Sequence, residues 1–204
     1  MKLYHFPSPN PQKVTFALRE LGLECEIVPV DLGKGEQRNP EFLAINPFGR
    51  VPVLVDGEFK LWDSHAILAY LGEKTGRLWP STAAGHADAL RWLFFLAQHI
   101  SPPAGDLAFN RIAARILGIP ADEDAIARGE KALPGVIGII DGHLTDHKWM
   151  LGNDFSLVDC AYTPVLNIIE KAGFSYQDFP RLRTYLDLCR ARSAWKDIPK
   201  LPGL

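Results

Sequence analysis

Residues 51–76, "VPVLVDGEFKLWDSHAILAYLGEKTG", read as a β-hairpin that runs directly into a helix. Asp56-Gly57 is a strong turn signal, and it lies between two runs rich in β-forming residues. Asp63 or Ser64 can cap the start of the following helix, and Gly76 can end it. This stretch therefore predicts the order strand, strand, helix.

The residues before this stretch predict a strand, a helix and another strand. "KLYHF" (2–6) and "CEIVPV" (25–30) have the composition of short strands. Between them, Asn10 is the expected N-cap of a helix and Pro11 its first residue. Two strands joined by one helix should lie parallel, through a right-handed crossover. Together with the hairpin, this order predicts an α/β thioredoxin-like domain with a mixed four-stranded sheet.

Strand signals disappear after residues 77–82, "RLWPST", which read as a connecting segment. One later stretch repeats apolar residues at helical spacing, at Leu90, Leu93, Phe94 and Ala97. Ser156 and Asp159 form an S-x-x-D capping box at the head of another helix. Pro134 should break or kink the helix that contains it. The predicted organisation is a thioredoxin-like domain at 1–78, a linker at 79–82 and an all-α helical domain at 83–204.

Composition and charge exclude several classes of protein. The chain has 22 Lys and Arg against 24 Asp and Glu, so no broad basic field indicates nucleic-acid binding. No stretch is long and apolar enough to suggest a membrane span, and the start does not resemble a signal peptide. Three distant cysteines indicate neither a disulfide framework nor a zinc site. The cysteine pattern and the start of the chain therefore lead us to expect a reduced, cytoplasmic protein. His143 and His147 lack a convincing third ligand, so we expect no metal.

Four stretches together resemble the cytosolic glutathione transferases, over essentially the whole chain. "NPFGRVPVLVDG" (46–57), "WDSHAILAYL" (62–71) and "FSLVDCAYTP" (155–164) are similar to the family's backbone-binding, γ-glutamyl-binding and helical-domain motifs. "SPNPQKVTFALRELGL" (8–23) looks like the serine-type branch, especially its bacterial nu-like members. The stretch lacks the early tyrosine and the Cys-Ser or Cys-Pro pair of other branches, so cysteine-based catalysis is not expected.

The resemblance implies that glutathione is the co-substrate and that Ser8 and Asn10 activate its thiol. A free thiol has a pKa of about 8.5, and lowering it by about two requires roughly 2.7 kcal/mol of preference for the anion. A hydrogen bond from the Ser8 hydroxyl, the N-terminus of the following helix and the Asn10 amide are the expected sources. The alternative is that Ser8 and Asn10 only cap that helix and shape the turn.

The resemblance also implies where the rest of glutathione binds. Val51-Pro52 would pair with the peptide like an added strand, through a cis bond expected from the family alone. Asp63 and Ser64 would bind the γ-glutamyl ammonium and carboxylate. Gln37, Arg38 and Arg50 would bind the glycyl carboxylate, and His99 would line the electrophile pocket. The alternatives are that Pro52 only starts a strand and that Asp63 and Ser64 only cap a helix. The other four would then be ordinary surface or packed residues.

The expected activity is attack of the glutathione thiolate on a small electrophile, in a two-fold homodimer implied by the family. An alternative is glutathione-dependent reduction of a disulfide or peroxide substrate, which also needs no protein cysteine. A third possibility is a binding module that holds glutathione without activating it, because a fold alone does not establish an activity.

Overall fold

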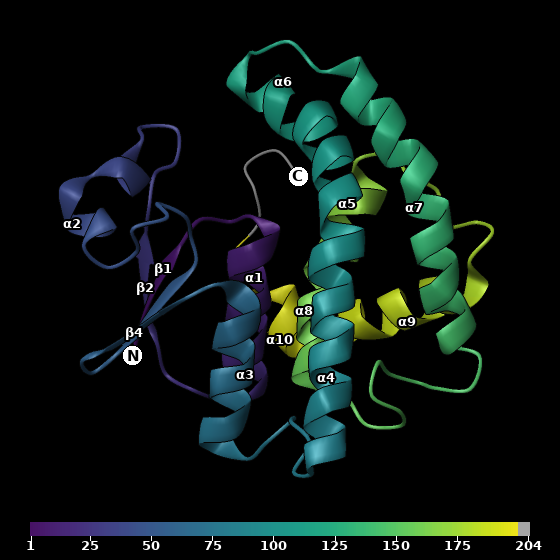
Figure 1. Ribbon diagram of the computed structural model, residues 1–204, viewed down its shortest axis with the longest axis horizontal. Coiled ribbons are helices and arrows are strands. Elements are labelled where there is room, and N and C mark those ends of the chain that lie inside the picture. The colour runs from purple at the N-terminus through teal and green to yellow at the C-terminus, as the bar shows by residue number, and fades with distance from the viewer. Residues whose placement is uncertain (200–204) are drawn as a thin grey trace.

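A four-stranded mixed sheet forms the core of the first part of the chain (Figure 1). The structure is a computed structural model that describes residues 1–199. The strands are β1 (Lys2–His5), β2 (Glu26–Pro29), β3 (Val53–Asp56) and β4 (Phe59–Trp62). Their order is β2-β1-β3-β4, with β1 parallel to β2 and the other two pairs antiparallel. The predicted mixed sheet is confirmed.

Helices cover both faces of this sheet. They are α1 (Pro9–Glu20), the 3-10 helix η1 (Glu36–Arg38), α2 (Pro40–Leu43) and α3 (Ser64–Thr75). Alternate strand residues point to opposite faces, so Leu3 and Leu54 join the main core with α1 and α3. Val53, from the other face, joins a smaller cluster with Phe42 of α2. Figure 1 shows α1 and α3 between the sheet and the later helices, with α2 away from them.

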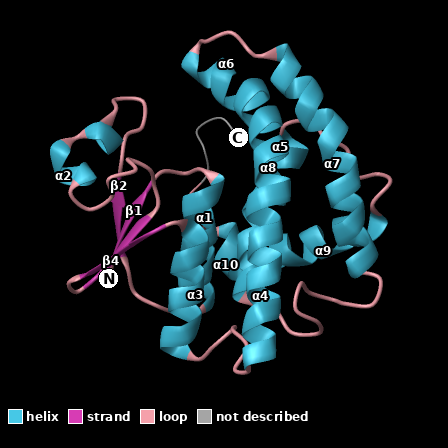
Figure 2. Cartoon of the chain, viewed as in Figure 1, coloured by secondary structure: helices cyan, strands magenta, loops and turns pink. Residues whose placement is uncertain are grey.

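The rest of the described chain is helical, as predicted. The four strands lie together on one side of the molecule in Figure 2, and all of them belong to the first part of the chain. Its helices are α4 (Ala83–Phe95), the π-helix η2 (Leu96–Ile100), α5 (Ser101–Ala108), the π-helix η3 (Phe109–Ala113), α6 (Ala114–Leu117), α7 (Glu123–His143), α8 (Leu157–Lys171), α9 (Pro180–Ala191) and α10 (Ser193–Lys196). The exact domain limits stay a prediction, and residues 200–204 lie outside the described part. Within residues 1–199, no helix combines the length and apolarity needed to cross a membrane.

Three local expectations need correction. Helix α1 begins at Pro9 with Ser8 as its N-cap, two residues earlier than predicted, because Pro9 can also occupy a first helical position. Of the break or kink expected at Pro134, the break is absent, because α7 runs from Glu123 to His143. The apolar repeat at Leu90, Leu93, Phe94 and Ala97 does not form one uniform face, because Leu90 and Phe94 are exposed on α4, whose buried side carries Ala89, Trp92, Leu93 and the following Leu96.

Asp159 ties the helical part together from its interior. Its buried carboxylate accepts hydrogen bonds from the Ser156 N–H (2.7 Å), the Ser156 hydroxyl (2.7 Å), the Met150 N–H (2.9 Å) and the Tyr185 hydroxyl (3.0 Å). Burial raises the pKa of this carboxyl, although the four donors oppose that effect. The capping box predicted at the head of α8 is therefore confirmed.

Helix α1 is buried on both sides, between the sheet and the helical part. Residues 11–18 are all buried, which is typical of a helix enclosed on every side. The Phe16 ring lies 5.7 Å from that of Phe155 and 5.4 Å from that of Trp195. At the other end of the helix, the Arg192 guanidinium donates two hydrogen bonds of 2.6 Å to the Glu20 carboxylate. Both parts of the chain therefore hold α1 in place.

Helix α1 also carries a buried lysine. Lys13 is fully buried, and its ammonium contacts Asn10 Oδ1 at 2.9 Å and His65 Nε2 at 3.0 Å. Burial lowers the pKa of Lys13 to about 7, with Asp63 acting in the opposite direction. Burial and the Lys13 charge lower the pKa of His65 to about 2, so this imidazole is neutral at ordinary pH.

We expect Lys13 to make stability depend on pH. Its pKa in the folded state lies below that of an unfolded lysine, so the unfolded chain binds more protons between about pH 7 and 10. Relative to Lys13→Met, the wild-type free energy of unfolding should rise by about 1.4 kcal/mol per pH unit in this window, and stay level below it.

Urea unfolding of the wild type and of Lys13→Met at several pH values measures this difference. Lys60→Met replaces an exposed lysine of β4 and serves as the matched control, with no comparable slope expected. Parallel pH profiles for the wild type and Lys13→Met would contradict the expectation.

Candidate functional site

Four chain segments meet at one end of the sheet. The register pairs His5 with Pro29, Tyr4 with Val53 and Val53 with Trp62. The residues that follow β1, β2 and β4, and those that precede β3, therefore lie at the same end. This brings Ser8, Val51-Pro52 and Asp63-Ser64 to one end of the sheet, called here the site edge, although they are far apart in the sequence.

A cavity of about 630 Å³ opens beside this edge. Ser8 and Asn10 line one wall together with the loop at 31–33, which follows β2. The opposite wall comes from α5, η3, α6 and α8 and is mostly apolar; it includes Ala104, Ala108, Phe109, Ile112, Ile116 and Ile168. The π-helix η3 contributes to this wall, and π-helical turns occur frequently at functional sites. The arrangement suits a polar group at the corner and an apolar molecule against the helices.

Ser8 holds the N-cap position without using its side chain as a cap. Its backbone is extended (φ −116°, ψ 165°), and its hydroxyl makes no capping hydrogen bond. Its carbonyl accepts the Gln12 N–H at 3.1 Å, so the helix start is satisfied by the main chain. The Ser8 hydroxyl is therefore available to the cavity, which counts against the reading that this serine is only a cap.

The first turn of α1 offers few main-chain donors. Pro9 and Pro11 occupy its first and third positions and have no N–H group. The N–H of Gln12 is already bonded to Ser8, which leaves the N–H of Asn10 as the main-chain donor of this turn. The helix terminus therefore offers fewer main-chain donors to an anion than the sequence suggested.

The two segments expected to bind peptide groups lie at this end of the sheet, although their residues are absent from the lining of the cavity. The Val51–Pro52 bond is cis, as the family resemblance implied. Val51 precedes the first paired residue of β3, so its main chain lies outside the sheet ladder. Asp63 is the N-cap of α3, and its Oδ1 accepts the N–H groups of His65 (2.9 Å) and Ala66 (3.3 Å). Ser64 is buried at the first position of that helix.

The residues expected at the glycyl end also gather near this edge. A Cβ placed on Gly49 would lie 3.1 Å from the Gln37 carbonyl oxygen and 3.8 Å from Arg38 Cδ, so η1 packs against the loop that carries Arg50. Gln37 Oε1 is buried and has no hydrogen-bond partner in the described part of the chain. The Arg50 guanidinium lies over the Phe48 ring, 4.7 Å from its centre.

Two buried polar residues that contact predicted site residues were missed in the sequence. Asn46 is buried and donates to the Arg50 carbonyl at 2.6 Å while accepting the Phe48 N–H at 3.0 Å, so it shapes the loop before Val51. Its position in the turn-forming stretch "NPFG" was the available signal. Lys13 was also missed, although it shares an apolar helix face with Ala17 at i, i+4 spacing.

His99 is not placed at the cavity. It is exposed on η2, its ring lies 5.3 Å from that of Phe95, and it is absent from the residues that line the cavity. Ser101 and Ala104, which follow in α5, do line the cavity. The helix turns His99 to a different face, so the structure lends no support to its expected place in the electrophile pocket.

The cysteines are poor nucleophiles. Cys25, Cys160 and Cys189 are unpaired thiols. Burial raises the pKa of Cys25, raises that of Cys160 well above its ordinary value and raises that of Cys189 to about 12. A thiol with a raised pKa carries little thiolate at neutral pH, so a nucleophilic sulfur would have to come from a ligand.

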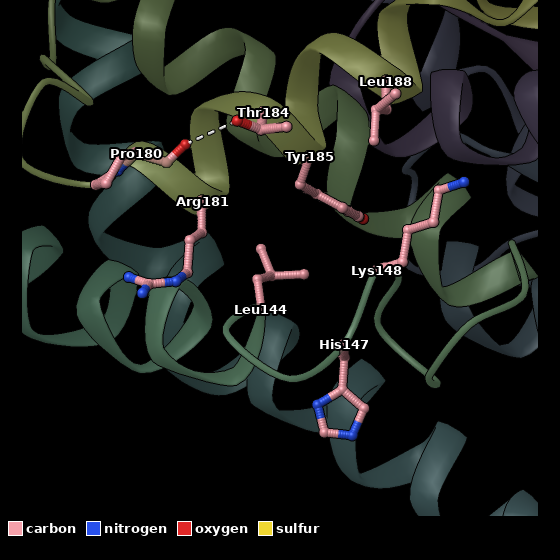
Figure 3. A pocket seen from close by; sticks show the side chains of 8 residues that line it. All are labelled: Leu144, His147, Lys148, Pro180, Arg181, Thr184, Tyr185 and Leu188. Carbon is pink, nitrogen blue, oxygen red and sulfur yellow. Dashed lines mark hydrogen bonds between the residues drawn. The ribbon is translucent and has the colours of Figure 1, made fainter.

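A second hollow, of about 430 Å³, lies between the end of α7 and α9 (Figure 3). Lys148 and Arg181 point their charged ends to opposite sides of it, around Leu144. The Thr184 hydroxyl is used within α9, where it donates to the Pro180 carbonyl at 3.1 Å. The polar groups do not converge on one point, so the first cavity remains the candidate site.

Comparisons with known proteins agree with this geometry. The model of the glutathione S-transferase N-terminal domain matches residues 1–73, and that of the C-terminal domain matches residues 123–188. Glutathione S-transferase F9 of Arabidopsis thaliana is 34% identical over 206 residues, covering 97% of this chain and 95% of the relative. Disulfide-bond oxidoreductase YfcG of Escherichia coli is 32% identical over 200 residues, covering 94% and 91%.

A solved structure extends the likeness to three dimensions. A glutathione transferase family member from Pseudomonas fluorescens, with two glutathione bound, superimposes with a TM-score of 0.86 at 29% identity, covering 97% of this chain and 92% of that one. The sequence relatives, the two domain models and the shared architecture agree. This chain belongs to the glutathione S-transferase family.

Proposed function

We propose that this protein binds glutathione at the edge formed by Val51 and the start of α3, and stabilises its thiolate with Ser8 and Asn10. The thiolate then attacks a small electrophile that rests on the apolar wall of the cavity. The observation that carries the proposal is that Ser8 lines the cavity beside Asn10 and that its hydroxyl makes no capping hydrogen bond to the helix. In this role the chain is a serine-type transferase.

The free energies are of the right size. A thiol pKa lowered by about two requires roughly 2.7 kcal/mol of preference for the thiolate. A hydrogen bond to a charged group contributes about 1.5–3 kcal/mol, so the Ser8 hydroxyl and the Asn10 amide are together sufficient. The protein thus supplies position and anion stabilisation, while glutathione supplies the nucleophile.

A second candidate function is glutathione-dependent reduction of disulfides. It is supported by the likeness to an oxidoreductase and to a structure that holds two glutathione molecules. In this reaction the bound thiolate attacks one sulfur of a disulfide, a mixed disulfide forms, and the other sulfur leaves as a thiolate. A second glutathione then attacks the mixed disulfide, which yields glutathione disulfide and the second reduced thiol. A glutathione-binding module without turnover is the third reading.

We also propose a homodimer, in line with the family. Phe94 and Leu90 lie one turn apart on α4, and their exposed fractions are 62% and 40%. Phe48 and Trp62 form another exposed aromatic pair, with ring centres 6.4 Å apart. Exposed apolar side chains of this kind favour burial against a second copy.

The first test is a titration of the thiolate absorbance of bound glutathione against pH. The wild-type thiol should titrate well below about 8.5, and Ser8→Ala should raise its pKa by about one, because the anion loses a donor. Ser101→Ala removes another hydroxyl from the cavity lining and should leave the thiol pKa unchanged. If bound glutathione titrates as it does in solution, the thiolate mechanism fails and the binding module gains support.

The second test compares two reactions, conjugation of an aryl halide and reduction of a small disulfide by glutathione. Both use the same thiolate, so Ser8→Ala should slow each of them roughly fivefold near pH 6.5. Steady-state rates with each substrate measure this. Disulfide reduction without conjugation would favour the reductase. If Ser8→Ala changes neither rate, both mechanisms are rejected.

The third test measures the oligomeric state by sedimentation velocity. The wild type should sediment as a dimer at micromolar concentration, and Leu90→Ser with Phe94→Ser should shift it towards the monomer, since the apolar contact is lost. Ile139→Ser changes an apolar residue of α7 that is 52% exposed, and it should not have this effect. A monomeric wild type would be inconsistent with the proposed dimer.

A further inference from the structure

The buried ammonium group of Lys13 lies next to Asn10, and neither peptide binding nor helix capping explains its presence there. Lys13 is fully buried in α1, three residues after Asn10, and its ammonium touches Asn10 and His65. Burying an ammonium group disfavours its charged form, and the lowered pKa of Lys13 reflects this cost. A methionine of similar length would fill the same space at lower cost, so the placement of this group calls for a reason beyond packing.

The hydrogen-bonding capacity of an ammonium group decides how its neighbours are oriented. A lysine ammonium has three donors and no acceptor, whereas a side-chain amide has one acceptor oxygen and one donor nitrogen. The contact of 2.9 Å between Lys13 Nζ and Asn10 must therefore involve the amide oxygen, as the structure has it. His65 must likewise accept through Nε2, which agrees with a neutral imidazole.

The orientation has a consequence on the cavity side. Because the Asn10 oxygen is held by Lys13, the amide nitrogen is turned away from the buried lysine. Asn10 is exposed and lines the cavity with Ser8. We propose that Lys13 is a positioning residue, whose buried ammonium fixes the Asn10 amide so that its N–H groups, and not its oxygen, face the thiolate of bound glutathione. This inference rests on the function proposed above.

The opposite orientation would work against thiolate formation. An amide oxygen turned to the sulfur would repel the anion, or would accept a hydrogen bond from the neutral thiol and favour that form. The groups that face Lys13 are Asp63, which favours its charged form, and His65, which is neutral. Once Lys13 loses its proton, the amine can accept a hydrogen bond, and the orientation of the amide is no longer fixed.

A double-mutant cycle on the thiol pKa of bound glutathione tests the inference. The variants are Lys13→Met, Asn10→Ala and the two combined, each titrated by thiolate absorbance between about pH 5 and 10. Lys13→Met should raise the thiol pKa by about one, a roughly tenfold loss of thiolate at low pH. In the Asn10→Ala background, the same substitution should have little further effect, because its action passes through Asn10.

A matched control separates positioning from a structural role. His65→Leu removes the link between Lys13 and α3 but keeps the contact with Asn10, so it should leave the thiol pKa unchanged. If His65→Leu reproduces the effect of Lys13→Met, Lys13 only ties α1 to α3 and the inference is wrong. Additive effects of Lys13→Met and Asn10→Ala would also overturn it, since they would mean direct action of the charge on the sulfur.

A further variant covers the case in which Lys13→Met does not fold. Asn10→Asp keeps a partner for Lys13 but has no N–H to offer the sulfur, so the thiol pKa should rise by at least one. An unchanged pKa in Asn10→Asp would overturn the inference. A wild-type thiol that titrates as in free solution would instead reject the proposed function itself. A lowered wild-type pKa that Lys13→Met leaves unchanged would reject only the positioning role.

Discussion

The burial of α1 on both sides is the constraint on which the rest of the structure depends. The sheet covers one side of the helix, and the aromatic side chains Phe155 and Trp195 cover Phe16 on the other. The ion pair between Glu20 and Arg192 holds the far end. A helix enclosed in this way cannot tilt without opening the core, so the corner at its N-terminus has a fixed position relative to both the sheet and the helical wall. The candidate site therefore stands on a rigid element.

The polar and the apolar walls of the cavity come from different parts of the fold. The edge of the sheet and the starts of α1 and α3 carry the polar groups, and their positions follow from strand register. The facing wall comes from α5, the π-helix η3, α6 and α8, and its side chains are mostly apolar. Proteins of one family can then keep the polar half and vary the apolar half, which is consistent with relatives named for different reactions.

Most of the fold could be predicted from short-range signals. The Asp56-Gly57 turn, the Gly76 stop and the S-x-x-D box each act within a few residues, and the structure has all three. The start of α1 was missed because both Pro9 and Pro11 suit the first turn of a helix, and local sequence does not separate them. The roles of Lys13 and His99 depend on contacts or helix facing set by distant residues, such as His65 for Lys13, and no local pattern contains that information.

The prolines of the first turn have a consequence for how such a site can change over time. In many anion sites the main chain provides the donors, and these are the same for every residue type except proline. Here Pro9 and Pro11 remove two of them, so in the function proposed above the side chains at positions 8 and 10 supply most of the donors to the anion. A single substitution there can retune the acidity of a bound thiol while the backbone stays the same. The corner is thus open to adjustment through its side chains, while the prolines keep restricting its main chain.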